Sequence, residues 1–407
     1  MSDSTSNAGM KLAPSRHAAA RIKDALIASA LQSSSVDAFF PALGSLLHGS
    51  SLAVDRMFLS LQTIHPAFRA RTYLWHDGDS QLNVVSWPHG LRNRPGYYHS
   101  PDYDVHRTGA ELRIRDLQNV GPNRCDLYGQ LRANGYIDYL IVPLPFSDGT
   151  VNTFSIATSQ PGGFPAASLN WFRRLADLLV IVFERYAVLE TRSAALETYL
   201  GRGVAGEVLK GRIRAGYGEE IEAAVLFADL HGFTRMSSHM TPLATVRLLN
   251  TYFDCLVGPI EEHGGYVLKF IGDAVLAFFP LDPKASAPRP VDAVRAIRQR
   301  LEELNEARIV AGDEPLSHAV CAHLGRVLYG NVGSSERLDF TVIGEAVNIA
   351  SRGVDTAKEL GVEYIFTRPF VERFVDSELT CIGNHAMEGV AGGLAFYSFK
   401  GDRFGEP

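Results

Sequence analysis

Two aspartates, Asp229 and Asp273, occupy positions from which their carboxylates could share one site. Asp229 stands at the carboxyl end of the apolar stretch 223–227, whose composition predicts a buried strand. Asp273 follows Gly272 in the expected two-residue turn of a hairpin over 266–279. If the first strand lies beside this hairpin, the carboxylates meet at one end of a sheet, as hard divalent cations with phosphate ligands require. Taken alone, either acid could instead be a helix cap or a turn residue.

A second pair of polar residues follows the expected strand 340–343. The helix expected from Glu345 onward places Asn348 and Arg352 on the same face, because residues four apart are neighbours on a helix. A neutral hydrogen-bonding amide beside a fixed cation suits a sugar and a phosphate. An exposed helix face is the alternative for this pair by itself. Together with the two aspartates, the pair favours a nucleotide site.

Composition excludes several classes of protein. The chain has 407 residues, enough for two domains, and a net charge of -6, which argues against a nucleic-acid partner bound by phosphate attraction. The strongly apolar run 178–183 is far shorter than the roughly 20 residues that span a bilayer, so no membrane insertion is expected. The four cysteines follow no metal-ligand spacing, which indicates reduced thiols and a cytoplasmic protein.

The pattern of elements divides the chain into four segments and predicts an α+β fold. They are a lead-in with a helix over 1–35, a first domain over 36–185, a helical linker over 186–218 and a second domain over 219–407. The expected strands of the first domain are 57–61, 71–76, 81–87, 139–145 and 150–158. The stretch 88–134 has no clear period, so we interpret it as long loops with one or two short helices.

From 140 to 184, the order of strand, Asp-Gly turn, strand, phenylalanine loop and terminal helix resembles the end of a GAF domain. The resemblance is one of pattern and extends over the first domain. It implies a sensor domain that binds a small molecule of unknown identity. Cys125 could be a chromophore attachment point, but an ordinary loop thiol is the favoured interpretation.

The helix expected over 168–200 carries a stripe whose members recur at alternating spacings of four and three. They are Leu175, Leu179, Val182, Tyr186, Leu189, Ser193, Leu196 and Leu200. Such a stripe is often one face of a core helix. Because this one leaves one domain and enters another, we interpret it as a coiled-coil linker in a parallel homodimer. The stretch 199–218 contains several glycines and predicts an irregular joint.

In the second domain, Thr241 and Pro242 are expected to start a helix that stops at Gly264. A further helix is expected over 290–309, and strands over 317–324 and 327–332. Three motifs, AAVLFADLHGFT, GGYVLKFIGDAVLAFF and LDFTVIGEAVNIASRGVD, then agree in order and spacing with one family. The second domain resembles the catalytic domain of class III adenylyl cyclases, which implies a ferredoxin-like, palm-type fold.

The resemblance implies roles for the residues that carry the motifs. Asp229 and Asp273 would hold two magnesium ions, for which manganese can substitute, and the backbone carbonyl of Leu230 would be a further ligand. Asn348 would orient the ribose, and Arg352 would stabilise the pentavalent phosphorus. In the family, metal ligands and transition-state residues come from different subunits, so two sites per homodimer are expected.

The resemblance also implies which residues bind ATP. Lys269 and Thr341 would recognise adenine, and the threonine is typical of the class IIIb branch. Backbone amides at Gly232, Phe233 and Thr234 would cradle the polyphosphate. The expected reaction is conversion of ATP to 3′,5′-cyclic AMP and pyrophosphate.

Other interpretations have their own sequence marks. Guanylyl cyclases usually place glutamate and cysteine where this chain has Lys269 and Thr341. A catalytically silent cyclase-like module usually lacks a metal acid or the asparagine and arginine pair, all of which are present here. One departure from the family is Gly353, where a large apolar residue is more common, at a cost of about 1 kcal/mol of helix propensity relative to alanine.

Overall fold

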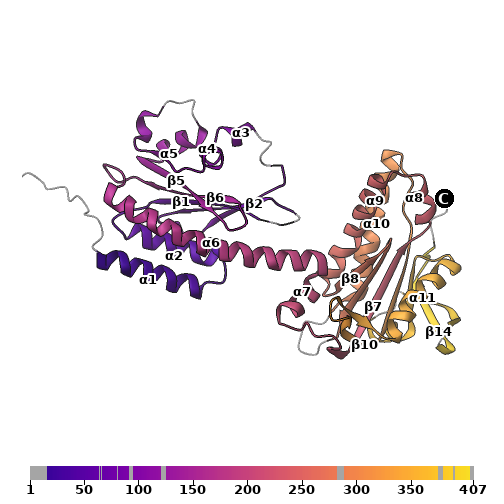
Figure 1. Ribbon diagram of the computed structural model, residues 1–407. Helices are drawn as coiled ribbons and strands as arrows, with labels where there is room; N and C mark the ends of the chain where they lie inside the picture. Colours follow the sequence, from indigo (N-terminus) through magenta and orange to yellow (C-terminus); the bar gives the residue numbers. More distant parts are fainter. Residues whose placement is uncertain are drawn as a thin grey trace, which may run out of the picture. The chain divides into compact units, whose positions relative to one another are not determined.

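A computed structural model describes residues 16–63, 65, 67–79, 81–90, 95–120, 125–281, 288–374, 379–387 and 390–403. The chain divides into two compact units, Met1–Ala195 and Leu196–Pro407 (Figure 1). The expected lead-in up to residue 15 lies outside the described residues. None of the helices in the described part combines the length and the apolar composition needed to cross a bilayer. The four cysteines are all free thiols.

The N-terminal unit is built on one six-stranded sheet with the strand order β3-β2-β1-β6-β5-β4. Its strands are β1 (Arg56–Gln62), β2 (Ala70–His76), β3 (Asn83–Trp87), β4 (Leu112–Ile114), β5 (Asp138–Pro145) and β6 (Val151–Thr158). Its helices are α1 (Arg16–Gln32), α2 (Val36–His48), α3 (Pro95–Tyr98), α4 (Pro101–Thr108), α5 (Asp126–Ala133) and α6 (Ala166–Leu200), with a 3-10 turn at Leu117–Asn119.

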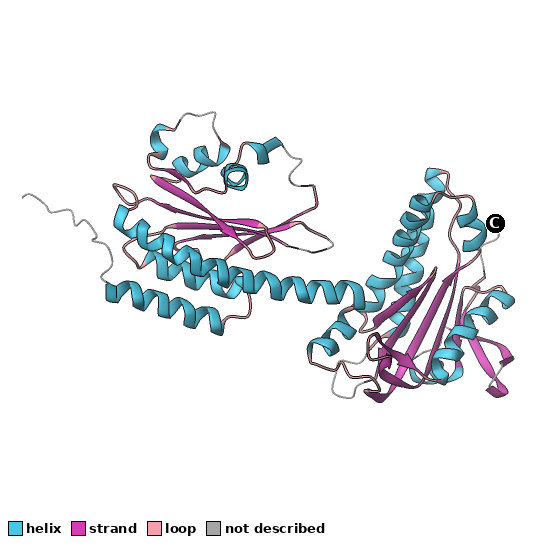
Figure 2. Cartoon of the chain, in the orientation of Figure 1, coloured by secondary structure: helices cyan, strands magenta, loops and turns pink. Residues whose placement is uncertain are grey.

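The two faces of this sheet are covered differently, because successive side chains of a strand point to opposite faces. Met57 and Leu59 face a large core with Phe40 of α2 and Phe183 of α6. A smaller core on the other face joins residues of α4 and α5 to β5. Figures 1 and 2 show α1, α2 and α6 along one face and α3 to α5 over the other. The sheet is therefore the middle layer of three.

The interpretation of 88–134 as long loops is wrong in part. This stretch contains α3, α4, α5 and the strand β4, which pairs with β5. Only Pro101 and Val105 of α4, and only Tyr128 and Leu131 of α5, are buried. Two buried residues per helix are too few to give a readable period, which is why the sequence pattern allowed for one or two short helices but could not place them.

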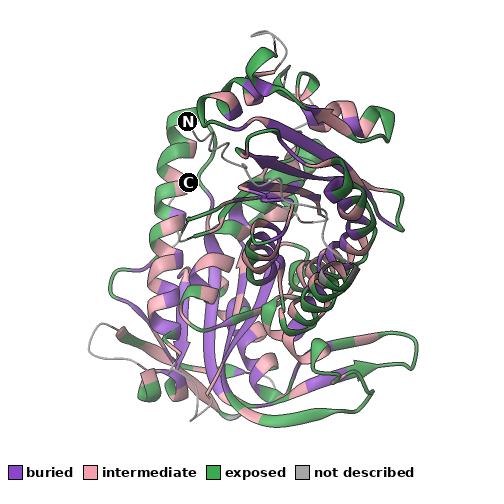
Figure 3. Cartoon of the chain, turned by 90° about the vertical axis from the view of Figure 1, so that its left-hand side faces the viewer, coloured by how far each residue is buried: buried purple, intermediate pink, exposed green. Residues whose placement is uncertain are grey.

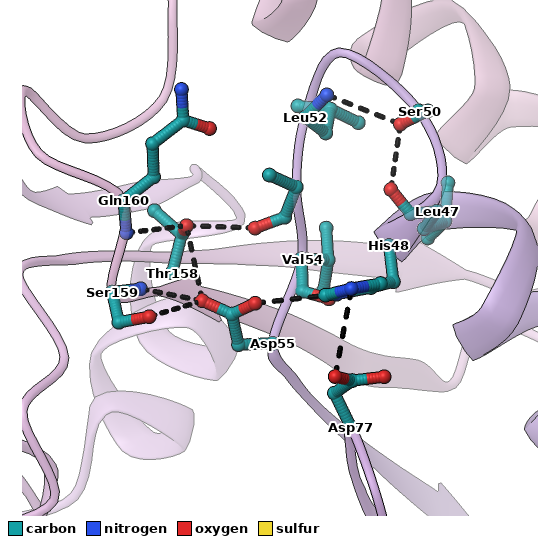
Figure 4. A network of polar contacts seen from close by, with 11 residues as sticks. Leu47, His48, Ser50, Leu52, Val54, Asp55, Asp77, Thr158, Ser159 and Gln160 are labelled. Carbon is teal, nitrogen blue, oxygen red and sulfur yellow. Dashed lines mark hydrogen bonds and ion pairs between the residues drawn. The ribbon is translucent and has the colours of Figure 1, made fainter.

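A polar network holds the loop between α2 and β1 (Figure 4). One carboxylate oxygen of Asp55 accepts hydrogen bonds from the backbone nitrogen of Ser159 at 2.7 Å and from its hydroxyl at 2.6 Å. The other oxygen lies 3.3 Å from Nδ1 of His48. The carbonyl of Ala53 accepts a hydrogen bond of 2.7 Å from the hydroxyl of Thr158. These bonds fix the end of α2 to the sheet.

Helix α6 is continuous over 35 residues, as its periodic stripe predicted. Leu175, Leu179, Val182 and Tyr186 of that stripe are buried in the core of their own unit. A coiled coil along the whole stripe is therefore excluded, because its first half already has intrachain partners. On α6, Ile181 and Val188 are instead exposed, at 65% and 58%.

The C-terminal unit contains an eight-stranded sheet with the order β13-β14-β12-β10-β7-β9-β8, and β11 pairs with β10. Its strands are β7 (Gly218–Leu230), β8 (Tyr266–Ile271), β9 (Ala274–Pro280), β10 (His318–Gly333), β11 (Leu338–Ile343), β12 (Tyr364–Thr367), β13 (Leu379–Met387) and β14 (Val390–Phe399). Its helices are α7 (Arg202–Leu209), α8 (Phe233–Ser238), α9 (Pro242–Glu262), α10 (Pro290–Ala311), α11 (Glu345–Leu360) and α12 (Arg368–Phe374).

Strand β7 lies between β9 and β10 near the centre of this sheet. One of its faces packs with α9 and α10, and the other packs with α11. Figure 3 shows the central strands largely buried and the outer sides of the helices exposed. A hydrogen bond of 3.3 Å from the amide of Ala244 to the hydroxyl of Thr241 confirms the expected start of α9.

Two sequence interpretations in this unit are corrected. The expected strands 317–324 and 327–332 are one strand, β10, which pairs with β7 along the whole length of β7. The stretch interpreted as an irregular joint contains the helix α7. Its glycines allow close packing: a Cβ atom on Gly203 would lie 2.7 Å from the ring of Tyr266 on β8. Gly203 therefore serves close packing, whereas Gly201, Gly211 and Gly216 have positive φ and lie outside the helices, so the prediction of an irregular joint is correct around α7.

Candidate active site

The structure brings Asp229 and Asp273 together at one end of the C-terminal sheet. Strand β7 pairs with β9 up to the pair Ala228 and Val275, so Asp229 extends toward the turn between β8 and β9. Gly272, with a φ of 67°, and Asp273 form that two-residue turn. The side chains of the two aspartates lie within hydrogen-bonding reach of each other. The hairpin and the converging acids were both predicted from the sequence.

The electrostatics of this pair favour a bound cation. Burial, the hydrogen bond to Asp229 and its charge together raise the pKa of Asp273 to about 6. A carboxyl group whose ionisation is opposed by a neighbouring carboxylate suits a hard divalent cation, whose charge would stabilise the ionised form. Within the described part of the chain, no three or more His, Cys, Asp or Glu side chains form a metal-binding group. Carboxylates from two residues, completed by water and phosphate oxygens, fit magnesium.

One residue at this pair was missed by the sequence analysis. The ammonium group of Lys358, in the last turn of α11, forms an ion pair with Oδ2 of Asp229. Its charge also acts to lower the pKa of Asp273. Lys358 and Asp229 are 129 positions apart in the chain, so no local pattern joins them.

The three residues expected to cradle a polyphosphate follow the end of β7. Leu230 is the last residue of that strand, and its side chain is buried. Gly232, with a φ of 69°, turns the chain into the short helix α8. Phe233 packs on the core, and Thr234 is exposed. The turn therefore lies directly beyond Asp229 and Leu230 at the end of β7.

Lys269 and Thr341, expected to recognise adenine, lie on different strands. The ammonium group of Lys269 on β8 contacts Oδ2 of Asp339 on β11 at 2.5 Å. Thr341 lies two residues farther along β11, opposite Gly330, and only 7% of it is exposed. In the part of the chain that the structure describes, the Lys269 ammonium group is bonded to Asp339 and not to Thr341. Asp339 was not predicted, because it lies 70 positions from Lys269.

Asn348 and Arg352 both lie in the first part of α11, and Asn348 is exposed. At 1.5 Å per residue, Asn348 lies about 15 Å along the helix axis from Lys358, which contacts Asp229. Gly353 has a packing reason: a Cβ atom there would lie 2.3 Å from the sulfur of Cys321 on β10. Its place in the helix therefore allows α11 to approach the sheet. Along α11, the amide expected at the ribose therefore lies about three turns from the lysine that contacts Asp229.

Comparison with known proteins decides the family of this unit. Residues 217–401 match the family of adenylate and guanylate cyclase catalytic domains. These residues form a class III cyclase domain. A curated adenylate cyclase of Anabaena cylindrica is 34% identical to the chain over 163 residues, which are 39% of this chain and 32% of that protein. Adenylate cyclase 1 of Rhizobium meliloti is 29% identical over 191 residues, 46% of this chain and 28% of the relative.

Solved structures similar to the chain include both adenylyl and guanylyl cyclases. The adenylyl cyclase CyaB from P. aeruginosa is 27% identical, with a TM-score of 0.40 over 44% of this chain and 94% of the other. The guanylyl cyclase Cya2 is 26% identical, with a TM-score of 0.38 over 47% of this chain and 96% of the other. The chain spans about a third or less of the curated relatives it matches. The likeness concerns the cyclase domain.

Proposed function

We propose that this chain converts ATP to 3′,5′-cyclic AMP and pyrophosphate. The observation that carries the proposal is the pair Asp229 and Asp273, which converges at the end of the sheet in a domain of the cyclase family. Curated relatives that match the cyclase domain are named adenylate cyclases, which supports ATP as the substrate.

The residues of the domain would act mainly by position and charge. Asp229, Asp273 and the carbonyl of Leu230 would hold two magnesium or manganese ions. When bound, such ions lower the pKa of the ribose 3′-hydroxyl and neutralise charge on the polyphosphate. Asn348 would hold the ribose so that its 3′ oxygen is in line with the α-phosphorus. Arg352 would place a fixed positive charge where negative charge accumulates in the transition state.

We propose that the site is shared between two copies of the chain, and the place of Asn348 on α11 supports this proposal. The helix places Asn348 about 15 Å along its axis from the residue that contacts Asp229. Lys269 lies on β8, and Asp273 lies in the turn at the end of that strand. A homodimer with two equivalent sites would let the metal acids of one copy meet Lys269, Asn348 and Arg352 of the other.

Guanylyl cyclase is the second candidate function, because the family includes both activities. The base is selected by the groups at its edge, and a site with unpaired polar groups rejects the wrong base. Lys269 supplies a donor and Thr341 a hydroxyl, which suit adenine. Asp339 contributes by holding the Lys269 ammonium group in place.

Exchanging the base-recognising pair tests this choice. Lys269→Glu with Thr341→Cys should lower ATP turnover and raise the ratio of GTP to ATP use by at least about tenfold. The exchange is made in an Asp339→Asn background, because a glutamate at position 269 would otherwise face a like charge. Turnover of both nucleotides is measured, with Asp339→Asn alone as the control. An unchanged ratio in a folded, active variant would contradict the assignment of the base-recognising residues.

We also propose that the N-terminal unit is a GAF-like sensor that regulates the cyclase domain. A cavity of about 390 Å³ lies between β1 to β3 and the helices α3 and α4. Phe58, Trp87 and Tyr97 supply aromatic walls, while Thr72 and Asp102 supply polar atoms. Such a lining suits a small, largely apolar ligand with a few hydrogen-bonding groups. Mass spectrometry of molecules that co-purify with the protein would identify it.

Strand β2 links this cavity to the helix that leaves the unit. Ala70 and Thr72 line the cavity, and Arg71 between them points to the opposite face. There Arg71 contacts a carboxylate oxygen of Glu190 on α6 at 2.7 Å. A displacement of β2 on ligand binding would therefore reach α6 directly. The exposed Ile181 and Val188 of α6 offer apolar surface for the same helix of a second copy.

Insertions into α6 test whether this helix transmits a signal. Two residues inserted after Glu190 should change basal cyclic AMP production strongly, since they rotate the downstream helix by about 200°. Seven inserted residues nearly preserve the phase and should change production much less. Production and dimerisation are measured for both variants and the wild type. Equal activity in all three dimers would show that the helix is a passive tether.

A further inference from the structure

The contact between Lys358 and Asp229 is a cation at a carboxylate that, in the proposed function, is a metal ligand. The ammonium group approaches Oδ2 of Asp229 from α11 of the same chain. The two side chains are 27% and 22% exposed, so the pair is only partly screened by water. Asp273 lies beside Asp229, so this cluster contains two carboxyl groups and the ammonium group of Lys358.

We propose that Lys358 is the resident counter-ion of Asp229, which a divalent cation must displace, so that this lysine sets the ion concentration at which the site fills. The inference rests on the proposed function, because it takes Asp229 as a metal ligand. Magnesium and manganese bind carboxylate oxygens at short range, and an ammonium group hydrogen-bonded to the same oxygen occupies that place. The two cations therefore compete for Asp229.

The position of Lys358 suits a counter-ion that can leave. It lies in the last turn of α11, where a positive charge is favoured by the helix dipole whether or not Asp229 is its partner. Its stem is flexible and its side chain partly exposed, so the ammonium group can turn to solvent when a stronger cation arrives. The helix itself need not move.

The charges of these side chains predict whether Lys358 weakens or strengthens metal binding. Without metal, the ammonium group of Lys358 forms an ion pair with the carboxylate of Asp229. Once a divalent ion is bound, a neighbouring ammonium group repels it. The competition for Oδ2 of Asp229 and this repulsion act in the same direction, so loss of the lysine charge should tighten metal binding.

The test is direct binding of Mn²⁺, followed by the electron paramagnetic resonance signal of the free ion at pH 8 without nucleotide. The full chain is compared with Lys358→Met, Lys358→Arg and Asp229→Asn. Lys210→Met is the matched control, since Lys210 pairs with Glu207 at 2.9 Å in the same unit. We expect Lys358→Met to bind the Asp229-dependent ion roughly tenfold more tightly. Lys358→Arg and Lys210→Met should bind it as the wild type does.

Each outcome separates the inference from the function on which it rests. Unchanged or weaker Mn²⁺ binding by folded Lys358→Met would overturn the inference. The inference would also be overturned if Lys358→Met raises the KM for ATP but leaves the half-saturating magnesium concentration unchanged. That result would indicate that Lys358 binds the substrate. If Asp229→Asn binds Mn²⁺ as the wild type does, Asp229 is no metal ligand, and the proposed function itself fails.

Discussion

Replacing Asp273 with alanine should lower cyclic AMP formation at least about 100-fold at every magnesium or manganese concentration. The reason is that metal ions contribute several kcal/mol of charge stabilisation in such reactions, and each 1.36 kcal/mol corresponds to a factor of ten in rate. The measurement is turnover of ATP by the purified dimer across a titration of each metal. Turnover near that of the wild type would contradict the assignment of Asp273 as a metal ligand.

Two controls show that the loss is not one of folding. Asp254→Ala removes an exposed acid of α9 outside the site and should leave turnover unchanged. Asp273→Asn keeps the size of the side chain and should stabilise the metal-free protein. The folded-state pKa of about 6 is above the ordinary value for aspartate, so the folded chain binds more protons and loses stability as pH rises toward and through 6.

The side-chain amide of the Asp273→Asn variant does not titrate, so its contribution to stability does not change with pH. At pH 8 the metal-free Asp273→Asn protein should therefore melt about 1–3 °C higher than the wild type, a range that allows for solvent screening. At pH 4 the difference should largely vanish, because Asp273 is then protonated in the folded wild type. Thermal melting in a chelator at the two pH values checks this. If the Asp273→Asn protein melts at a lower temperature than the wild type at pH 8, the interaction between the two aspartates is not repulsive.

Local signals predicted the catalytic elements of the second unit well. The hairpin at Asp273 was readable because a glycine at positive φ and alternating apolar residues mark such turns. The helix α9 was readable because Thr241 is its N-cap and Pro242 its first residue. The convergence of Asp229 and Asp273 then required only that β7 lie beside the hairpin, as it does.

What the sequence could not show depends on contacts between distant segments. Lys358 and Asp339 come to Asp229 and Lys269 through the packing of α11 and the pairing of β11, and no spacing along the chain reveals either contact. The stripe on α6 correctly predicted a helix, but it did not show which residues pack against that helix. A heptad pattern shows that one face is apolar, and the core of the N-terminal unit already covers Leu179 and its neighbours.

Complementation between two inactive variants tests the central claim, a cyclase site built from two copies of the chain. Asp229→Ala removes a metal acid, and Asn348→Ala removes the amide expected at the ribose. Each homodimer should be inactive, because both of its sites lack one component. In a heterodimer the two defects fall in the same site, so the other site is complete.

The measurement is cyclic AMP formation from ATP by an equimolar mixture of the two variants, with heterodimers demonstrated by differential tagging. The account expects recovery to about a quarter of wild-type activity, because half of the dimers are mixed and each has one intact site. The wild-type dimer, assayed alongside, should release cyclic AMP and pyrophosphate in equal amounts. Demonstrated heterodimers without recovery would contradict a shared site, and a folded wild-type dimer that forms no cyclic AMP would contradict the proposed activity.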